Sequence, residues 1–291
     1  MSEEVMTMTE PRPAKQRGAG SGVTDAALLF DEPGPRGRIL ITIGSAVAVL
    51  GIVALVAAGL YQLSLSGQLD YPKWRYFLGR SVVSQLLEAA GTTLSMGVVA
   101  AVFTFPLGIA LGWLRLLDNR AIRWLVGIWI DAMRAVPMLL LVYFFLLVVP
   151  RFATISDFWK LALPIVMCTS ATTAEVFRSG VRALDRGQTE AAWALGMSPS
   201  LTMRLILAPQ ALRLMLPTLI TQMVTIIKGT TLAYVLAYPE LMYRGSTMIG
   251  QAKIDAHLSV FFQTYIIIAL LYIIVNWSLG ALARYIESRT R

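Results

Sequence analysis

The chain has one cysteine, one histidine and few charged residues, and each scarcity excludes a class of protein. Asp, Glu, Lys and Arg make up only 14% of its 291 residues, whereas a soluble globular domain has about a quarter. The single cysteine, Cys168, excludes an internal disulfide, and the single histidine, His257, excludes a multi-histidine metal site. We interpret Cys168, inside a hydrophobic block, as a packing residue and His257 as a polar loop residue. We expect no metal or cofactor bound by this chain and no catalytic residues.

Hydrophobic residues, in contrast, make up 56% of the sequence. The formal net charge of +8 could indicate a nucleic-acid-binding protein, but most Lys and Arg lie between hydrophobic blocks rather than in one basic stripe. Charges in that position set the orientation of membrane helices. We therefore predict a protein of the lipid bilayer with no nucleic-acid partner.

Six hydrophobic blocks approach or exceed the length of about 20 residues that crosses a bilayer as a helix. They extend over residues 39–63, 88–115, 124–150, 161–177, 214–239 and 258–283. The sequence thus predicts an all-α membrane protein with about six transmembrane helices. Residues 1–38, rich in Pro, Gly and charge, are predicted to form a disordered cytoplasmic tail. For residues 39–63 a removed leader is the alternative, but a leader would lie nearer the start of the chain.

Three features within the blocks bear on packing. Pro137 removes a backbone hydrogen bond and should kink the third helix. Gly108 and Gly112 form a small-xxx-small pattern, which favours either a dimer interface or close packing inside the helix bundle. The fourth block has only 14 uncharged residues before Glu175, so it spans barely or turns polar atoms toward an interior. Between the last two blocks, the sequence predicts a polar loop that ends at His257.

The orientation follows from the distribution of positive charge. With the N-terminus inside, the inner segments carry 16 of the 25 Lys and Arg residues, and the outer segments carry seven. An excess of Lys and Arg marks the cytoplasmic side. Both termini, including the tail at residues 284–291, and the stretch from Glu190 to Pro209 are therefore predicted to be cytoplasmic.

The stretch from Glu190 to Pro209 predicts two short helices joined by a sharp turn. Thr189 is a plausible N-cap of the first helix, and Gly196 can end it in the left-handed conformation. Ser198 caps the second helix, which should end at about Leu207 because Pro209 interferes. Their faces carry the apolar residues Trp193, Leu195, Met197, Leu201, Met203, Leu205 and Ile206. This apolar surface needs a cover, either a partner protein or the lipid surface.

The same stretch resembles the cytoplasmic signature of ABC importer permeases. Glu190-Ala191-Ala192, Gly196, Ile206 and Pro209 fall at the spacing of that signature, and Ala208 departs from its usual Leu. The resemblance extends over about residues 86–283 and is most similar to the polar amino-acid subfamily. It is supported by the stretches Glu88–Leu94, Arg134–Leu140, Ala174–Gly180, Gly187–Gln188 and Pro209–Arg213.

The resemblance implies a multi-pass permease of a bacterial-type inner membrane. Its core would be a five-helix domain, residues 86–283, and residues 39–63 would be an extra N-terminal helix. The expected partners are a second permease subunit, identical or homologous, a cytoplasmic ATPase dimer that holds ATP and Mg²⁺, and an extracytoplasmic substrate-binding protein. Residues 186–209 would then be the coupling segment that fits a groove on the ATPase. This chain shows no Gly-x-x-x-x-Gly-Lys-Ser/Thr phosphate loop, so we do not expect it to be the ATPase itself.

Lys228 is a candidate for the substrate path. It lies 15 residues beyond Arg213, about 22 Å along a helix and past the bilayer midplane. A lysine there costs about 2.5 to 3.5 kcal/mol unless it is paired or hydrated. An amino-acid carboxylate would be a suitable partner, with Thr230 and Thr231 as hydrogen-bonding neighbours. The alternative is a lysine that snorkels or pairs permanently with a protein acid. Gly229 replaces the polar residue usual in the similar family motif, which weakens the transfer of binding contacts.

Two charged pairs are candidates for structural or gating ion pairs. Asp131 and Arg134, three residues apart, share a helix face and are expected to pair. Glu175 and Arg178 should lie near the cytoplasmic end of their helix, where interhelical pairing or gating is more plausible than substrate contact.

Several functional classes stay open on the sequence. An importer for a polar amino acid, with glutamate or a close relative as the best candidate, is favoured by the resemblance and by the tail segment Leu29–Arg36, which is similar to those of glutamate-type permeases. A secondary transporter should show an inverted repeat with paired broken helices, and none is convincing. A permease for another small solute, and a membrane enzyme or receptor, are further alternatives, although no recognisable nucleophilic motif supports an enzyme.

Overall fold

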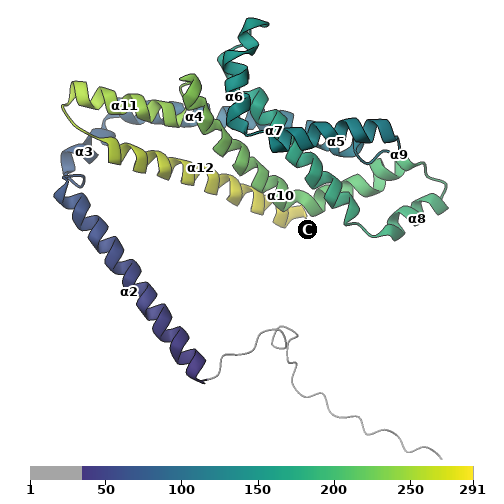
Figure 1. The fold of residues 1–291 in the computed structure, drawn as a ribbon, viewed down its shortest axis with the longest axis horizontal. Coiled ribbons are helices and arrows are strands. Elements are labelled where there is room, and N and C mark those ends of the chain that lie inside the picture. The colour runs from purple at the N-terminus through teal and green to yellow at the C-terminus, as the bar shows by residue number, and fades with distance from the viewer. Residues whose placement is uncertain (1–34, 291) are drawn as a thin grey trace, which may run out of the picture. The chain divides into compact units, whose positions relative to one another are not determined.

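The computed structural model describes residues 35–290, and over this range every element of secondary structure is a helix and none is a strand (Figure 1). The predicted disordered tail lies largely outside these residues. The helical elements are α2 (Pro35–Leu65), α3 (Tyr71–Arg75), η1 (Tyr76–Leu78), α4 (Arg80–Leu114), α5 (Arg120–Ala135), α6 (Met138–Leu147), η2 (Val149–Arg151), α7 (Asp157–Arg182), α8 (Arg186–Ala194), α9 (Pro199–Thr202), η3 (Met203–Leu207), α10 (Ala208–Gly229), η4 (Thr230–Leu236), α11 (Leu241–Asp255) and α12 (Phe261–Thr290). The described residues divide into two units, one that ends at residue 63 and one that begins at residue 64.

Four helical stretches are long and apolar enough to cross a membrane. They are Arg36–Leu65, Arg80–Leu114, Pro199–Leu236 and Phe261–Leu282, and the pair α5 and α6 would make a fifth if it counts as one broken span. The prediction of an all-α, multi-pass membrane protein is confirmed, but the exact count of six helices is not. In the first unit, the predicted extra helix corresponds to α2, whose window of 18 residues is fully exposed.

Helix α7 forms the centre of the second unit, packed against α4, α5, α6 and α10. At 26 residues, it is about 39 Å long, longer than the predicted fourth block. Its hydroxyl-rich turn faces the interior, where the Oγ1 atoms of Thr104 and Thr169 lie 2.9 Å apart. Because neighbouring helices cover it, α7 can hold polar side chains that a lipid-facing helix could not.

The small-xxx-small pattern packs α4 closely against α7. A Cβ added to Gly108 would lie 2.5 Å from the Cβ of Thr173, and one added to Gly112 would lie 2.7 Å from the carbonyl oxygen of Ala174. Only glycine permits backbones to approach this closely. Of the two alternatives, the contacts support bundle packing within the chain.

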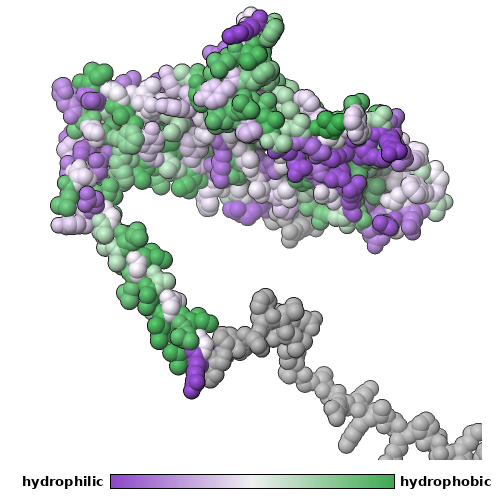
Figure 2. Space-filling view, viewed as in Figure 1, coloured by the Kyte–Doolittle hydropathy of each residue, from purple (hydrophilic) through white to green (hydrophobic). Residues whose placement is uncertain are grey.

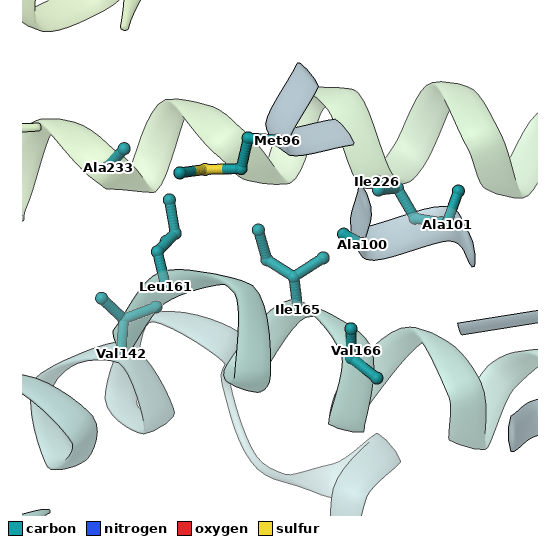
Figure 3. Close-up of a cluster of buried hydrophobic side chains, with 9 residues drawn as sticks. All are labelled: Met96, Ala100, Ala101, Val142, Leu161, Ile165, Val166, Ile226 and Ala233. Carbon is teal, nitrogen blue, oxygen red and sulfur yellow. The ribbon is translucent and has the colours of Figure 1, made fainter. Parts of the chain in front are cut away.

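A cluster of buried apolar side chains joins α4, α6, α7, α10 and η4 (Figure 3). Its members are Met96, Ala100 and Ala101 on α4, Val142 on α6, Leu161, Ile165 and Val166 on α7, Ile226 on α10, and Ala233 on η4. Close packing of this kind replaces the hydrophobic driving force that helices lack in lipid.

The predicted kink at Pro137 is a complete break. Helices α5 and α6 meet at an angle of 95°, and Val136 and Pro137 both have extended backbone ψ values of 127°. A proline disfavours the helical conformation of the residue before it, which explains why the helix ends rather than bends. Helix α6 consequently projects away from α5 (Figure 1).

The loop predicted before His257 is wrong over most of its length, because Leu241–Asp255 form the helix α11. Glu240 is its N-cap and accepts a hydrogen bond of 2.7 Å from the backbone N–H of Tyr243. The same carboxylate accepts another of 2.7 Å from the hydroxyl of Tyr272 on α12, and it is fully buried. Burial raises the pKa of the Glu240 carboxyl, an effect that these hydrogen bonds oppose. His257 does lie in a loop.

Candidate coupling segment and translocation site

Helix α8 begins earlier than predicted. Asp185, not Thr189, is its N-cap, and the Asp185 carboxylate accepts a hydrogen bond of 2.6 Å from the N–H of Gly187. Both residue types cap helices, but the helix extends one turn further back. Glu190 therefore lies exposed within α8 rather than in its first turn, together with the exposed Ala191 and the buried Ala192.

The turn after α8 forms as predicted. Gly196 has a φ of +77°, and the hydrogen bonds from Gly196 N–H to Trp193 O and from Met197 N–H to Ala192 O make a Schellman motif. Ser198 then caps α9, its hydroxyl accepting from the N–H of Leu201 at 3.4 Å. The C-cap of α8 is followed directly by the N-cap of α9, and together these hydrogen bonds fix the direction of the chain through the turn.

The predicted end of the second short helix before Pro209 is wrong. After α9 the chain forms the π-helical turn η3, in which the N–H of Ala208 donates to the carbonyl of Met203, and it then continues directly into α10. Pro209 lies in the first turn of α10, where its missing N–H is tolerated. Ile206, half-buried, falls within η3. The π turn lets the chain accommodate the proline without breaking, so Pro199–Leu236 form one continuous stretch.

The apolar side chains of this segment are exposed. The exposed fractions are 56% for Trp193, 82% for Leu195, 43% for Leu201 and 59% for Leu205. Trp193 also lines a cavity of about 400 Å³ between the segment and the turn that follows α4. Exposed large apolar side chains on one segment favour an interaction site there.

The residues of the candidate substrate path lie at the end of α10. Lys228 is exposed in its last turn, and Thr230 is buried at the start of η4. The Thr230 hydroxyl donates to the carbonyl of Ile227 and the Thr231 hydroxyl to that of Lys228, each at 2.7 Å. Within residues 35–290, the Lys228 ammonium lies within 4.0 Å of no carboxylate oxygen, which leaves it accessible to an external anion.

The charged residues form one cluster, in which the predicted pair of Glu175 with Arg178 is formed and the predicted pair of Asp131 with Arg134 is not. Arg115, at the end of α4, contacts both Asp131, at 3.4 Å, and Glu175. Arg178 donates to the other oxygen of Glu175 at 2.7 Å. The expected pair of Asp131 with Arg134 is not formed, and Asp131 on α5 pairs with Arg115 from the end of α4 instead. Sequence reasoning missed Arg115, and its place directly after an uncharged block was the only signal.

Arg134 instead lines a different cavity. This cavity has a volume of about 440 Å³ and lies between α5, α7 and α10. Arg134 and Glu175 contribute opposite charges to its lining, and Thr172, Ser179 and Thr218 contribute hydroxyl groups. A cavity with both charges and hydroxyl groups can hold a small zwitterion.

The comparisons with known proteins place the chain in a family. Residues 104–291 match the model of the binding-protein-dependent transport system inner membrane component. The chain is 34% identical over 234 residues to the glutamate transport system permease protein GluD of Corynebacterium glutamicum, covering 79% of this chain and 84% of that protein. It is 33% identical to the probable glutamine ABC transporter permease protein GlnP of Bacillus subtilis, covering 68% and 89%.

Solved structures agree on the fold. A crystal structure of an amino acid ABC transporter with histidines has a TM-score of 0.64 at 23% identity, covering 72% of this chain and 95% of that one. The predicted resemblance to amino-acid ABC permeases is thus confirmed. The chain belongs to the family of binding-protein-dependent transport system inner membrane components.

Proposed function

We propose that this protein is the permease subunit of an ATP-driven importer that moves a polar amino acid, glutamate or a close relative, across the cell membrane. A second permease subunit and a cytoplasmic ATPase dimer would complete the transporter, and an extracytoplasmic binding protein would deliver the substrate. Both termini would lie in the cytoplasm.

The coupling segment carries this proposal. Its exposed apolar residues, Trp193 and Leu195, stand on a helix that caps and a glycine turn hold in place. A capped helix transmits a displacement to the membrane helices, whereas a flexible loop would absorb it. The coupling role is proposed for Glu190, Ala191, Ala192, Gly196, Ser198, Ile206 and Pro209, of which the buried Ala192 would act by packing and not by touching the ATPase.

The identity of the cargo rests on the relatives and on charge. GluD is named for glutamate and GlnP for glutamine, and the glutamate/aspartate import permease protein GltK of Escherichia coli is 28% identical over 214 residues. Lys228 would contact the substrate carboxylate at one level of the path, with Thr231 beside it, whereas the predicted contact of Thr230 is opposed by its burial and by its hydrogen bond to the Ile227 carbonyl. The cavity lined by Arg134 and Glu175 would offer both signs of charge at another.

A copurification experiment tests the partner. Glu190→Lys reverses an exposed charge in the centre of the coupling segment, and we expect it to abolish copurification of the ATPase while the permease still inserts. Asp157→Lys, which reverses an exposed charge at the start of α7, is the matched control and should keep the ATPase. Retention of the ATPase by Glu190→Lys would count against the coupling role.

Uptake by the complete transporter tests the cargo. Radiolabelled glutamate should be displaced by unlabelled glutamate far better than by arginine, histidine or glutamine. Lys228→Met should raise the concentration of glutamate needed for half-maximal uptake, with normal assembly. An unchanged half-maximal concentration in that variant would remove Lys228 from the path, and preferential displacement by arginine would refute the acidic cargo.

A further inference from the structure

An arginine-lined pocket lies between α5 and α7, at the end of the bundle from which the coupling segment emerges. It has a volume of about 400 Å³. Its lining includes Arg115, Arg123, Arg178 and Arg182, and also Trp124, Gly127, Ile128 and Asp131. Figure 2 shows hydrophilic side chains gathered over this part of α5.

Two of the four arginines are neutralised inside the protein. Arg115 and Arg178 share the carboxylates of Asp131 and Glu175, and their side chains are only 18% and 22% exposed. Four guanidinium groups against two carboxylates leave a formal excess of two positive charges at the pocket.

The excess resides on Arg123 and Arg182. Arg123 lies in the first turn of α5 and Arg182 in the last turn of α7, and both are exposed. Within residues 35–290, the contact recorded for Arg123 is a hydrogen bond of 3.4 Å to the carbonyl of Leu117, and neither arginine lies within 4.0 Å of a carboxylate oxygen. Most of their N–H groups are therefore available to an oxyanion, which guanidinium groups bind in bidentate geometry.

The surroundings of the pocket are those of a bilayer boundary. Trp124 on α5 is 64% exposed, and Leu125 and Ile128 beside it are 60% and 49% exposed. A tryptophan next to arginines, followed along the helix by exposed aliphatic side chains, is the pattern of a membrane interface. The predicted topology places this end of α5 at the cytoplasmic leaflet, where the anionic lipids are concentrated.

We propose that this pocket binds the phosphate of an anionic phospholipid headgroup, with Arg123 and Arg182 as its ligands and Trp124 against the upper acyl chain. Gly127 brings the backbone of α5 next to the Arg115 guanidinium, which would lie at the van der Waals distance of 3.6 Å from a Cβ added there. A lipid held here contacts both α5 and α7, and its headgroup lies beside the helix that leads into the coupling segment at Asp185.

Quenching by brominated lipids tests the proposal on the complete transporter in nanodiscs. The contribution of Trp124 is the difference in fluorescence between the native protein and Trp124→Phe. Brominated phosphatidylglycerol should quench this contribution at a mole fraction about five- to thirtyfold lower than brominated phosphatidylcholine, as expected for one to two arginines near the surface.

The variants separate this site from general charge attraction. Arg123→Gln with Arg182→Gln should remove the preference for phosphatidylglycerol. Arg120→Gln, on the same end of α5 but outside the pocket lining, should keep it. Equal quenching by the two lipids in the native protein, or an equal loss in Arg120→Gln, would overturn the proposal. Inorganic phosphate distinguishes the source of the anion: the preference should persist in millimolar phosphate, and phosphate binding to the pocket together with equal quenching by the two lipids would make the lipid assignment wrong.

Discussion

A substitution at Gly196 tests the coupling segment directly, because it changes the backbone conformational preference of the turn and removes no side-chain contact. Gly196 has a φ of +77°, and a Cβ added to it would meet no atom within 4 Å. Gly196→Ala therefore creates no clash. Its effect is the strain of placing an L-residue in the left-handed region, which costs about 1 to 2 kcal/mol.

The size of the effect follows from that strain. The strain falls on the conformer that directs Trp193 and Leu195 outward, so fewer molecules present the binding-competent turn. A cost of about 1 to 2 kcal/mol corresponds to about five- to thirtyfold weaker binding of the ATPase subunits. Gly196→Asn should lose much less, because asparagine tolerates this conformation better than other non-glycine residues.

The assay measures the affinity of purified permease in nanodiscs for its ATPase subunits, together with transport. Gly250→Ala on α11 is the matched control, since a Cβ there also meets open space and the glycine has no positive φ. Native affinity in Gly196→Ala would refute the reasoning, as would a loss in Gly196→Asn as large as in the alanine variant.

Two further predictions concern the membrane domain. Gly108→Val should destabilise the protein by about 1 to 3 kcal/mol, because even its Cβ would lie 2.5 Å from Thr173. Thermal unfolding in detergent measures this loss. Gly91→Val is the control, since a Cβ there meets open space, and it should unfold like the native protein. Since burial raises the pKa of Glu240, the stability that this group contributes is present below the ordinary glutamate pKa of about 4.3 and is lost as pH rises through its raised value. The melting temperature of Glu240→Gln should accordingly improve relative to the native protein as pH rises, and a difference independent of pH would contradict the raised pKa.

Local sequence rules predicted the turn of the coupling segment well and its ends less well. Gly196, Ser198 and Pro199 each have a role fixed by their own chemistry, so their positions could be read directly. Asp185 and Thr189 are both capping residues, and the choice between them depends on where α7 ends. Pro209 looked like a helix end because the π turn that accommodates it involves a hydrogen bond between Ala208 and Met203, which no composition rule predicts.

Helix α11 was missed because its polar residues hid its periodicity. Its buried positions are Leu241, Gly245, Met248 and Ala252, a spacing of four, three and four that marks one helix face. This signal was present in the sequence. The sequence alone does not explain why residue 245 is a glycine. In the structure, the Ile268 side chain would lie 2.0 Å from a Cβ added at Gly245, so a larger residue does not fit.

The charge cluster shows why ion pairs cannot be predicted from the spacing of charges along one helix alone. Asp131 and Arg134 satisfy the spacing for a pair, yet Asp131 contacts Arg115, which lies 16 residues away in the sequence. Arg115 also reaches Glu175, 60 residues away. Contacts over such separations depend on how α4, α5 and α7 pack, and the glycines that determine this packing say nothing of which charges will meet.

The segments that would transmit an ATPase displacement are joined by covalent continuity and by close packing. From Pro199 to Leu236 the helix is continuous, so movement of the turn at its start is delivered to α10. Helix α10 in turn contacts α7 where a Cβ on Gly180 would lie 2.7 Å from Met215. Surfaces packed this closely cannot slide independently without opening a void. Because Glu175 on α7 also binds Arg115 at the end of α4, we expect α4, α7 and α10 to move as one body, and the break before α6 to be the hinge.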